Sequence, residues 1–310
     1  MIADKLKPGD EIRVVAPSRS LAIVWQKAYD GALDFFEEQG FRLTFSKNAR
    51  EVNKFQSSSI ASRVHDLHEA FADPNVKMII TSLGGFNANQ LLPHLDYELI
   101  RNNPKLFCGF SDITALLNAI HAMTGLVTYH GPHFSTFGFN KAPEYTRKAF
   151  FDCVMQPGAF TATPSEAAGS YTVLQEGCCE GTIIGGNLCT LNLLQGTPYM
   201  PDIRNKVLFL EDDNVTGEYC PYEFDRNLQS LLQVSGAETI RGIVFGRFDS
   251  SCKLDAETIA EIIQNKVSLD IPVIYGADFG HVFPIFTFPI GGKVKLCAEN
   301  KKARIQITEH

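Results

Sequence analysis

Apolar and polar residues follow two rhythms along the first half of the chain, one typical of buried strands and the other of amphipathic helices. Short apolar runs predict strands at residues 11–16, 41–45, 76–82 and 106–110. Apolar residues at helical spacing predict helices at residues 26–39, 59–72 and 113–123. Because strands alternate with helices at this spacing, we expect a parallel sheet wrapped by helices.

The second half of the chain resumes this alternation after an interruption. Strands are expected at residues 181–186, 206–210, 242–245, 272–275 and 293–296, and helices at 188–195, 224–234 and 256–266. The interruption, residues 136–174, is rich in Pro, Gly, Ser and Thr, which suits a linker or a covering segment. We therefore expect an α/β fold with an N-terminal parallel-sheet domain at 1–135 and a C-terminal α/β domain at 175–310.

Composition and charge narrow the class of protein. The 310 residues are 45% hydrophobic and 20% charged, which is ordinary for a globular chain and excludes a disordered one. No apolar run approaches the roughly 18 residues that a membrane-spanning helix needs. The net charge of −7, without a block of Lys or Arg, gives no electrostatic footprint for nucleic acid or an anionic membrane. The N-terminus is charged and has no apolar signal core, so we expect a cytoplasmic protein.

Eight cysteines could form disulfides, but their setting in the sequence favours free thiols. Cys178 and Cys179 are adjacent, no C-x-x-C pair occurs, and Cys297 lies in an apolar stretch. Because zinc-type spacing and a signal peptide are both missing, we expect reduced thiols and no metal site.

Three polar residues stand where predicted strands end, and ligand groups gather at such ends in open parallel sheets. Ser111 lies where a strand turns directly into a helix, whose free N–H groups favour developing negative charge, although a simple helix N-cap is the alternative. Glu211 follows an apolar strand and is either an orienting carboxylate or a solvated loop acid beside Asp212 and Asp213. His281 lies in a glycine-containing loop that follows a strand.

Gly84 and Gly85 directly follow the strand at 76–82 and could bring backbone N–H groups close to a ligand, although a tight turn explains them equally well. His130 and His133 stand near another strand end and could line a pocket. The glycine pattern is neither a dinucleotide fingerprint nor a P-loop, so a nicotinamide or flavin enzyme is a weaker alternative. A nucleophile, a base, an orienting acid and N–H donors are together what acyl transfer requires.

Several longer motifs resemble the LD-carboxypeptidase family of serine peptidases, which includes muropeptide LD-carboxypeptidases and the microcin C immunity hydrolases. They are the glycine pair at 84–85 and the segments 91–97, 100–105, 109–116, 185–188, 208–211 and 280–281. The resemblance covers nearly the whole chain, with the motifs in the family's order.

The resemblance implies a Ser-Glu-His triad, with Ser111 as nucleophile, Glu211 as orienting acid and His281 as base. It places the oxyanion hole at the backbone N–H groups of Gly85 and Asp112. It also implies an N-terminal α/β domain that carries the serine and a C-terminal α/β domain that carries Glu and His, with the active site at their interface. Family members need no metal or organic cofactor, are cytoplasmic and are often homodimers.

The substrate expected from the resemblance is a small peptide such as a muropeptide, from which a C-terminal residue is cleaved. The alternative is an amide that joins an acyl group to a nucleotide, because the segments 212–222 and 281–292 look more like the immunity branch. Arg19 and Arg226 could make bidentate contacts with a carboxylate, or pair structurally with nearby acids. Gly84 and Asn187 are the other candidate substrate-binding residues.

A nucleobase would need an aromatic platform, and the single tryptophan, Trp25, is far in sequence from the triad residues. Stacking would then fall to one of four aromatic residues: Phe134, Phe137, Phe139 and Tyr145. A third hypothesis, from another class, is a non-catalytic small-molecule binding protein, in which Ser111 and His281 would be ordinary pocket residues.

Overall fold

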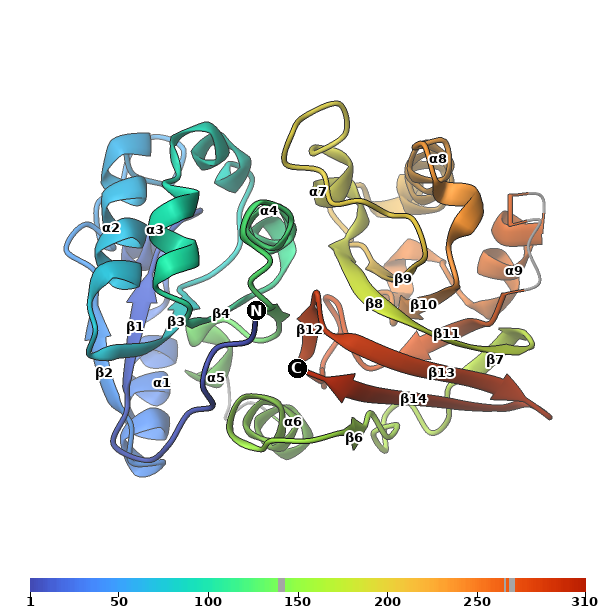
Figure 1. The fold of residues 1–310 in the computed structure, drawn as a ribbon, viewed down its shortest axis with the longest axis horizontal. Coiled ribbons are helices and arrows are strands. Elements are labelled where there is room, and N and C mark those ends of the chain that lie inside the picture. The colour runs from blue at the N-terminus through green and yellow to red at the C-terminus, as the bar shows by residue number, and fades with distance from the viewer. Residues whose placement is uncertain (139–142, 265, 268–270) are drawn as a thin grey trace.

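The computed structural model describes residues 1–138, 143–264, 266–267 and 271–310, which form two α/β domains side by side, each built around its own sheet (Figure 1). The first sheet has the strand order β12-β5-β4-β3-β1-β2. Its strands are β1 (Glu11–Val15), β2 (Arg42–Phe45), β3 (Val76–Thr81), β4 (Leu106–Gly109), β5 (Thr128–His130) and β12 (Phe288–Ile290). The first five are parallel, as the alternation of strands and helices predicts, and β12 is antiparallel to β5.

Helices cover both faces of this sheet, because alternate residues of its central strands point to opposite sides. Met78 and Ile80 of β3 belong to one buried cluster, whereas Ile79 belongs to another. The cluster around Ile79 receives residues from α2 (Ile60–Ala72), α3 (Tyr97–Asn102) and α4 (Thr114–Thr124). The opposite cluster receives residues from α1 (Gln26–Glu38), α5 (Phe134–Gly138) and α6 (Glu144–Met155).

The second sheet is mixed, with the order β6-β14-β13-β8-β9-β10-β11-β7. Its strands are β6 (Phe160–Thr161), β7 (Thr172–Gln175), β8 (Gly177–Asn187), β9 (Lys206–Glu211), β10 (Gly242–Gly246), β11 (Val273–Ala277), β13 (Lys293–Glu299) and β14 (Lys302–Glu309). Strands β8 to β11 are parallel, and the outer strands are antiparallel to their neighbours. The helices of this domain are α7 (Leu188–Asn192), α8 (Cys220–Leu232) and α9 (Ala256–Gln264). None of the helices in the described ranges combines the length and apolar character needed to cross a bilayer.

The stretch 136–174, expected as a linker or covering segment, contains helix α6 and two short strands. Phe150, Cys153 and Val154 of α6 are buried against the first domain, since their spacing places them on one face of the helix. Further along, the backbone N–H and the hydroxyl of Ser165 both donate to Asp278 of the second domain. The segment therefore packs against both domains.

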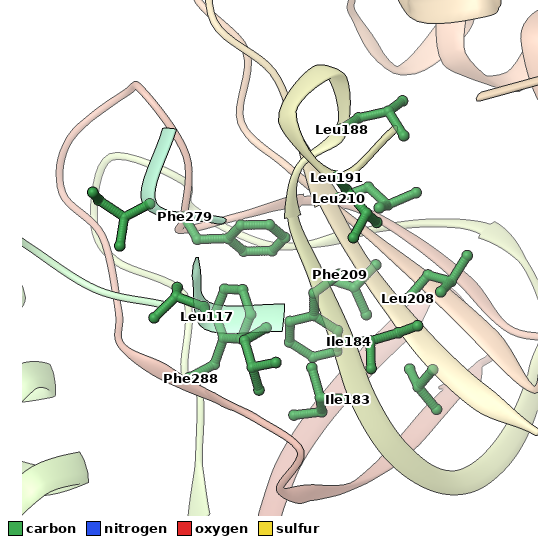
Figure 2. Packing of buried hydrophobic residues seen from close by; sticks show 14 of the residues in the cluster. Leu117, Ile183, Ile184, Leu188, Leu191, Leu208, Phe209, Leu210, Phe279 and Phe288 are labelled. Carbon is green, nitrogen blue, oxygen red and sulfur yellow. The ribbon is translucent and has the colours of Figure 1, made fainter. Parts of the chain in front are cut away.

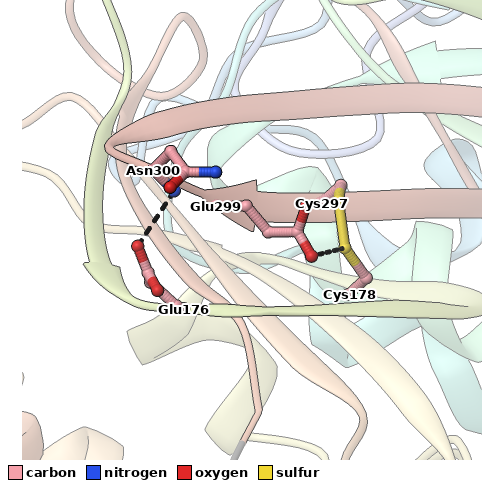
Figure 3. Close-up of a disulfide and its surroundings, with 5 residues drawn as sticks. All are labelled: Glu176, Cys178, Cys297, Glu299 and Asn300. Carbon is pink, nitrogen blue, oxygen red and sulfur yellow. Dashed lines mark hydrogen bonds between the residues drawn. A yellow bond between two sulfur atoms is a disulfide. The ribbon is translucent and has the colours of Figure 1, made fainter.

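One pair of cysteines corrects the expectation of reduced thiols throughout. Cys178 of β8 and Cys297 of β13 form a disulfide, and the described chain holds six other cysteines as free thiols (Figure 3). The antiparallel register sets Cys297 directly opposite Cys178, with their Cα atoms 4.2 Å apart. The two residues are 119 positions apart in the chain, so only the pairing of β8 with β13 brings them together.

The two domains share a continuous buried cluster (Figure 2). Leu117 of α4 and Phe288 of β12 lie beside Ile183, Ile184 and Phe209 of the second sheet in that view. The ring of Phe288 lies 4.9 Å from that of Phe209 and 4.5 Å from that of His130. Because β12 follows the loop of His281 and then pairs with β5, the C-terminal half of the chain completes the sheet of the first domain.

Polar contacts at the same interface are fully buried. The side-chain amide of Asn118 in α4 donates to the carbonyl of Gly185 at 2.8 Å and accepts from its N–H at 3.3 Å. The hydroxyl of Thr114 accepts from the backbone N–H of Asn187 at 3.0 Å. These contacts fix the end of β8 against the helix that follows Ser111.

Replacing Asn118 should therefore destabilise the protein. Asn118→Ala leaves the buried N–H and carbonyl of Gly185 without their partners, and we expect a loss of about 2–4 kcal/mol in the free energy of unfolding. Chemical denaturation measures this loss. Asn75→Ala, which removes contacts within an exposed turn, is the control and should change stability by less than about 1 kcal/mol. Equal effects of the two variants would contradict the role given to Asn118.

Candidate active site

Ser111 lies in a sharp turn between β4 and α4. Its φ angle is 61°, in the left-handed region that costs a non-glycine residue about 1 kcal/mol or more. The preceding Phe110 is extended, and a single turn of 3₁₀ helix begins at Ser111. The Ser111 side chain makes no capping hydrogen bond to this turn or to α4, so the helix-cap alternative does not describe it. The turn instead presents the hydroxyl outward at the carboxyl end of the sheet.

The loop after β3 approaches Ser111 closely. A Cβ atom on Gly84 would lie 2.9 Å from the Cβ of Ser111 and 3.0 Å from its hydroxyl, so this position has room only for glycine. The carbonyl of Gly84 accepts a hydrogen bond from Nε of Arg19 at 3.0 Å. Because the carbonyl and the following N–H point in opposite directions in a trans peptide, this contact turns the N–H of Gly85 away from Arg19.

Asp112 ties this loop to the turn of Ser111. Its carboxylate is buried and accepts hydrogen bonds from the hydroxyl of Ser18 at 2.5 Å and from the N–H groups of Asn87 and Ala88, both at 2.9 Å. In the described chain, no acceptor contacts the backbone N–H of Gly85 or of Asp112. Both N–H groups therefore remain available near the Ser111 hydroxyl.

His281 and Glu211 reach Ser111 from the second domain. Nε2 of His281 lies 3.1 Å from the hydroxyl oxygen of Ser111, and Nδ1 lies 2.7 Å from Oε2 of Glu211. Glu211 is the last residue of β9 and is fully buried. Gly280 has a φ of 107°, and a Cβ there would lie 3.0 Å from the Glu211 carboxylate, so glycine is required before His281.

The electrostatics of this pair are set by opposed effects. Burial disfavours the imidazolium of His281, but the charge and hydrogen bond of Glu211, with smaller contributions from Asp213 and Asp212, raise the pKa of His281 to about 9. Burial would raise the pKa of Glu211, but His281 and, to a smaller extent, His130 outweigh this effect and lower that pKa to about 2. Glu211 is therefore a carboxylate over the working pH range, and it holds His281 with Nδ1 as the donor.

Two further histidines surround the site, as their position near a strand end suggests. His130 is fully buried, and its Nε2 lies 3.9 Å from the second carboxylate oxygen of Glu211. Nδ1 of His133 contacts the hydroxyl of Thr81 at 2.7 Å. Burial and the nearby charges of His281 and His130 hold the pKa of His133 well below its usual range, so His133 is neutral.

Asp212 differs from the solvated loop acid that the run of three acids suggests. It is 8% exposed, and its carboxylate accepts from the side-chain amide of Asn187 at 3.0 Å. Burial and the charges of Glu211 and Asp213 raise the pKa of Asp212 to about 8. The end of β9 runs into the domain interface, which explains why the acid after Glu211 is covered.

The structure places the candidate substrate-binding residues in different surroundings. Gly84 lies against Ser111, and Arg19 contacts Gly84. Asn187 is buried next to Glu211 in the sheet, but its amide oxygen caps α7 and its amide nitrogen binds Asp212. The side chain of Arg226 is 74% exposed and pairs with Glu223 on the same helix at 3.4 Å.

The aromatic residues considered as a nucleobase platform are mostly in the core. Phe134 and Phe137 are buried in the first domain, so they present no face for stacking. The hydroxyl of Tyr145 donates to the carbonyl of Thr163, and Phe139 lies outside the described residues. Trp25 is 67% exposed, at the start of α1.

Sequence reasoning missed one arginine near the site. Arg63 lies on α2 and is 2% exposed, with its guanidinium directed to the carbonyls of Pro17 and Asn87 at the carboxyl end of the sheet. A signal was present, because Arg63 falls between apolar residues on the buried face of the predicted helix 59–72.

Potential metal ligands gather at two places in the described chain, and neither includes a residue contacting Ser111. Cys178, Cys297 and Glu299 form one group, but the two sulfur atoms are bonded to each other (Figure 3). His65, Asp66 and Glu69 form the other on α2, where Asp66 already accepts hydrogen bonds from Asn48.

A hydroxyl, an imidazole and a buried carboxylate linked in this order, on an α/β fold, are the arrangement that serine hydrolases use. Two family models match the chain, the LD-carboxypeptidase N-terminal domain over residues 12–131 and the LD-carboxypeptidase C-terminal domain over residues 180–296. The chain therefore belongs to the LD-carboxypeptidase family, and it is a serine peptidase by membership.

Related proteins carry names from both branches of this family. The protein named putative carboxypeptidase YocD of Bacillus subtilis is 46% identical over 100% of both chains. The microcin C7 self-immunity protein MccF of Escherichia coli is 30% identical over 100% of this chain and 96% of its own. The murein tetrapeptide carboxypeptidase of Pseudomonas aeruginosa is 26% identical over 90% of this chain and 91% of its own.

Solved structures share the complete fold. An MccF-like protein from Bacillus anthracis has a TM-score of 0.97 at 49% identity over 100% of both chains. MccF in complex with glutamyl sulfamoyl guanosine has a TM-score of 0.87 at 29% identity over 99% of this chain and 98% of its own. The two-domain α/β architecture expected from the sequence is confirmed.

The raised pKa of His281 gives a direct test of the electrostatics. Glu211→Gln removes the charge that stabilises the imidazolium, so the pKa of His281 should fall from about 9 to its ordinary value or below, because burial is then unopposed. Titration of the Cε1 proton of His281 by NMR measures the change. Asp213→Asn, which removes a weaker and more distant charge, is the matched control and should lower the pKa less. An unchanged titration in Glu211→Gln would contradict the coupling.

Proposed function

We propose that this protein hydrolyses an amide bond of a small peptide by nucleophilic catalysis, with Ser111, His281 and Glu211 as the triad. The observation that carries the proposal is the unbroken chain of contacts from the Ser111 hydroxyl through His281 to the buried Glu211. A serine hydroxyl is a poor nucleophile until a neighbouring imidazole takes its proton. The 3.1 Å separation lets Nε2 of His281 do so without rearrangement.

In the first half of the reaction, the neutral form of His281, which its pKa of about 9 makes the minor form near pH 7, takes the hydroxyl proton as Oγ of Ser111 bonds to the substrate carbonyl carbon. The tetrahedral intermediate then collapses as His281 passes that proton to the leaving nitrogen, which departs as an amine and leaves an acyl ester on Ser111. In the second half, water attacks the ester and gives its proton to His281, which returns it to Ser111. Glu211 holds the imidazole tautomer and stabilises its charged form, without taking a proton.

The oxyanion of each intermediate binds the backbone N–H groups of Gly85 and Asp112 in this proposal. Both groups lack an acceptor in the described chain, and the Arg19 contact to Gly84 supports the orientation of the Gly85 N–H. One such donor is worth about 3–4 kcal/mol of transition-state stabilisation in comparable enzymes. Arg19 is therefore a positioning residue for the oxyanion hole.

We propose that the substrate is a short peptide with a C-terminal residue to be removed, such as a muropeptide. A second candidate is an aminoacyl nucleotide amide, which the likeness to a structure named MccF-like favours. The relative MccF binds glutamyl sulfamoyl guanosine, so a nucleotide conjugate fits the family's cleft in at least that protein. A homodimer acting in the cytoplasm accompanies both proposals, as the family resemblance implies.

Removal of the Ser111 hydroxyl tests the mechanism. Ser111→Ala should lower kcat by several orders of magnitude, because the nucleophile is lost, while the thermal transition stays nearly unchanged. A fluorophosphonate probe should label the wild type at Ser111 and leave this variant unlabelled. Ser170→Ala, at an exposed serine of the covering segment, is the control and should keep full activity and labelling. Full turnover in Ser111→Ala would refute the proposed nucleophile.

A side-by-side assay decides between the two substrates. We expect release of D-alanine from a muropeptide tetrapeptide and no cleavage of an aminoacyl sulfamoyl nucleotide, with products followed by mass spectrometry. Cleavage of the nucleotide conjugate alone would reject the carboxypeptidase proposal in favour of the second candidate. Wild-type protein labelled at Ser111 serves as the inactive control in both reactions.

A further inference from the structure

A cavity of about 470 Å³ opens behind the loop that carries Gly84 and Gly85. It lies between the end of β1, the start of α2 and the segment after β3. Its described lining residues are Arg19, Asn53, Phe55, Ser58, Ser59, Ile60, Arg63, Phe86, Asn87 and Gln90. Two of them are arginines and none is acidic, so the cavity is electropositive.

Arg63 is a buried cation that no carboxylate contacts. Its two terminal nitrogens donate to the backbone carbonyls of Pro17 and Asn87 and to the side-chain oxygens of Asn87 and Gln90. Its Nε is buried and has no partner in the described chain. Neutral oxygens therefore hold this guanidinium in place but do not balance its charge.

The acid whose charge acts on Arg63 is Asp112, and its carboxylate is already occupied. Ser18, Asn87 and Ala88 donate three hydrogen bonds to one oxygen of Asp112. The second guanidinium, Arg19, uses Nε on the carbonyl of Gly84, and the structure gives its terminal nitrogens no partner in the described chain. Two positive groups thus face a cavity whose described lining contains no acidic residue.

The mouth of the cavity is apolar. Phe55 is 66% exposed and Phe86 is 74% exposed, and both line it together with Ile60 at the start of α2. Phenyl rings exposed to water cost free energy because their apolar surface is hydrated. They would be stabilised by packing against the apolar part of a ligand whose charged end reaches the arginines.

The cavity adjoins the loop that approaches Ser111. Phe86 directly follows Gly85, whose N–H faces the proposed oxyanion, and Asn87 is bound to Asp112, the residue after Ser111. Arg19 contacts both the cavity and the carbonyl of Gly84. A ligand whose amide lies at Ser111 could therefore place a neighbouring group in this cavity.

We propose that the cavity is a subsite for an anionic group, a carboxylate or a phosphate, carried on the substrate, with Arg19 and Arg63 as its cationic ligands. This inference rests on the proposed function, because it takes Ser111 as the point of cleavage. Guanidinium groups suit the planar, bidentate recognition of carboxylates and phosphates, and a partly desolvated site strengthens the contact. The subsite would make the negative group a condition of tight binding.

The test uses Ile60, because Arg19 and Arg63 also support the loop and would confound the result. Ile60 is the first residue of α2 and is 36% exposed at the cavity. Ile60→Glu and Ile60→Gln have nearly the same size and differ in charge, and a carboxylate at a helix N-terminus does not disfavour folding. Both changes are placed in the full-length Ser111→Ala protein, so that binding is measured without turnover.

Isothermal titration calorimetry measures the affinity of each variant for two pairs of probes. One pair is a muropeptide tetrapeptide ending in D-alanine and the same peptide with a C-terminal carboxamide, and the other is adenosine monophosphate and adenosine. In the Ile60→Gln background, the anionic member of at least one pair should bind about tenfold more tightly than its neutral counterpart. In the Ile60→Glu background this ratio should fall close to one. The pair that responds identifies a carboxylate or a phosphate as the ligand.

Equal ratios in the two backgrounds for both pairs would overturn the subsite. That result is distinguishable from failure of the proposed function, which is judged by fluorophosphonate labelling of Ser111 and does not involve the cavity. If Ser111 is labelled but the affinity ratios are the same for Ile60→Glu and Ile60→Gln, only the subsite is rejected. If the affinity ratio differs between Ile60→Glu and Ile60→Gln but Ser111 is not labelled, the proposed nucleophile is rejected and the anion-binding cavity remains.

Discussion

The hydrogen bond between His281 and Ser111 joins the two domains. Contacts across the domain interface hold Nε2 of His281 and the hydroxyl oxygen of Ser111 3.1 Å apart. Gly185 and Gly186 let the end of β8 reach the first domain, since a Cβ on Gly186 would lie 2.6 Å from the hydroxyl of Thr114 and 3.1 Å from the His130 ring. Asn118 then binds both backbone groups of Gly185. The glycine pair is therefore a requirement of domain contact, and Glu211 lies on the neighbouring strand at that point.

A second set of contacts fixes the loop of His281. Arg247 pairs with the buried Asp278 at 3.0 Å and donates to the carbonyl of Pro284 at 2.7 Å, so it spans the loop from one side of His281 to the other. Asp278 also accepts two hydrogen bonds from Ser165 of the covering segment. Beyond the loop, β12 pairs with β5 of the first sheet. The loop of His281 is thus anchored to the second domain by Arg247 and to the first domain by β12, and this fixes the position of the imidazole.

The sequence predicts most of the parallel strands and the positions of Ser111, Glu211 and His281 at strand ends, because apolar runs and the residues that follow them are local features. Features that depend on the pairing of strands far apart in the chain cannot be predicted from such local patterns. The edge strand β12 has only three residues, and Cys178 meets Cys297 only through the register of two strands. Asp212 is buried by the neighbouring domain, so its sequence neighbours give little sign of its burial, whereas Arg63 lies among apolar residues on one face of its predicted helix.

The charges around Ser111 are divided between the domains. Glu211, Asp212 and Asp213 stand behind His281 in the second domain, whereas Arg19 and Arg63 stand behind the loop of Gly84 in the first. Asp112 belongs to the first domain but uses its charge to fix the loop between Ser111 and the cavity. Glu211 is needed to stabilise the imidazolium, and its negative charge also repels an anion from that side of the serine. In the proposed function, a negatively charged substrate would be oriented by both domains, with its charged end toward the arginines and its scissile amide between them and His281.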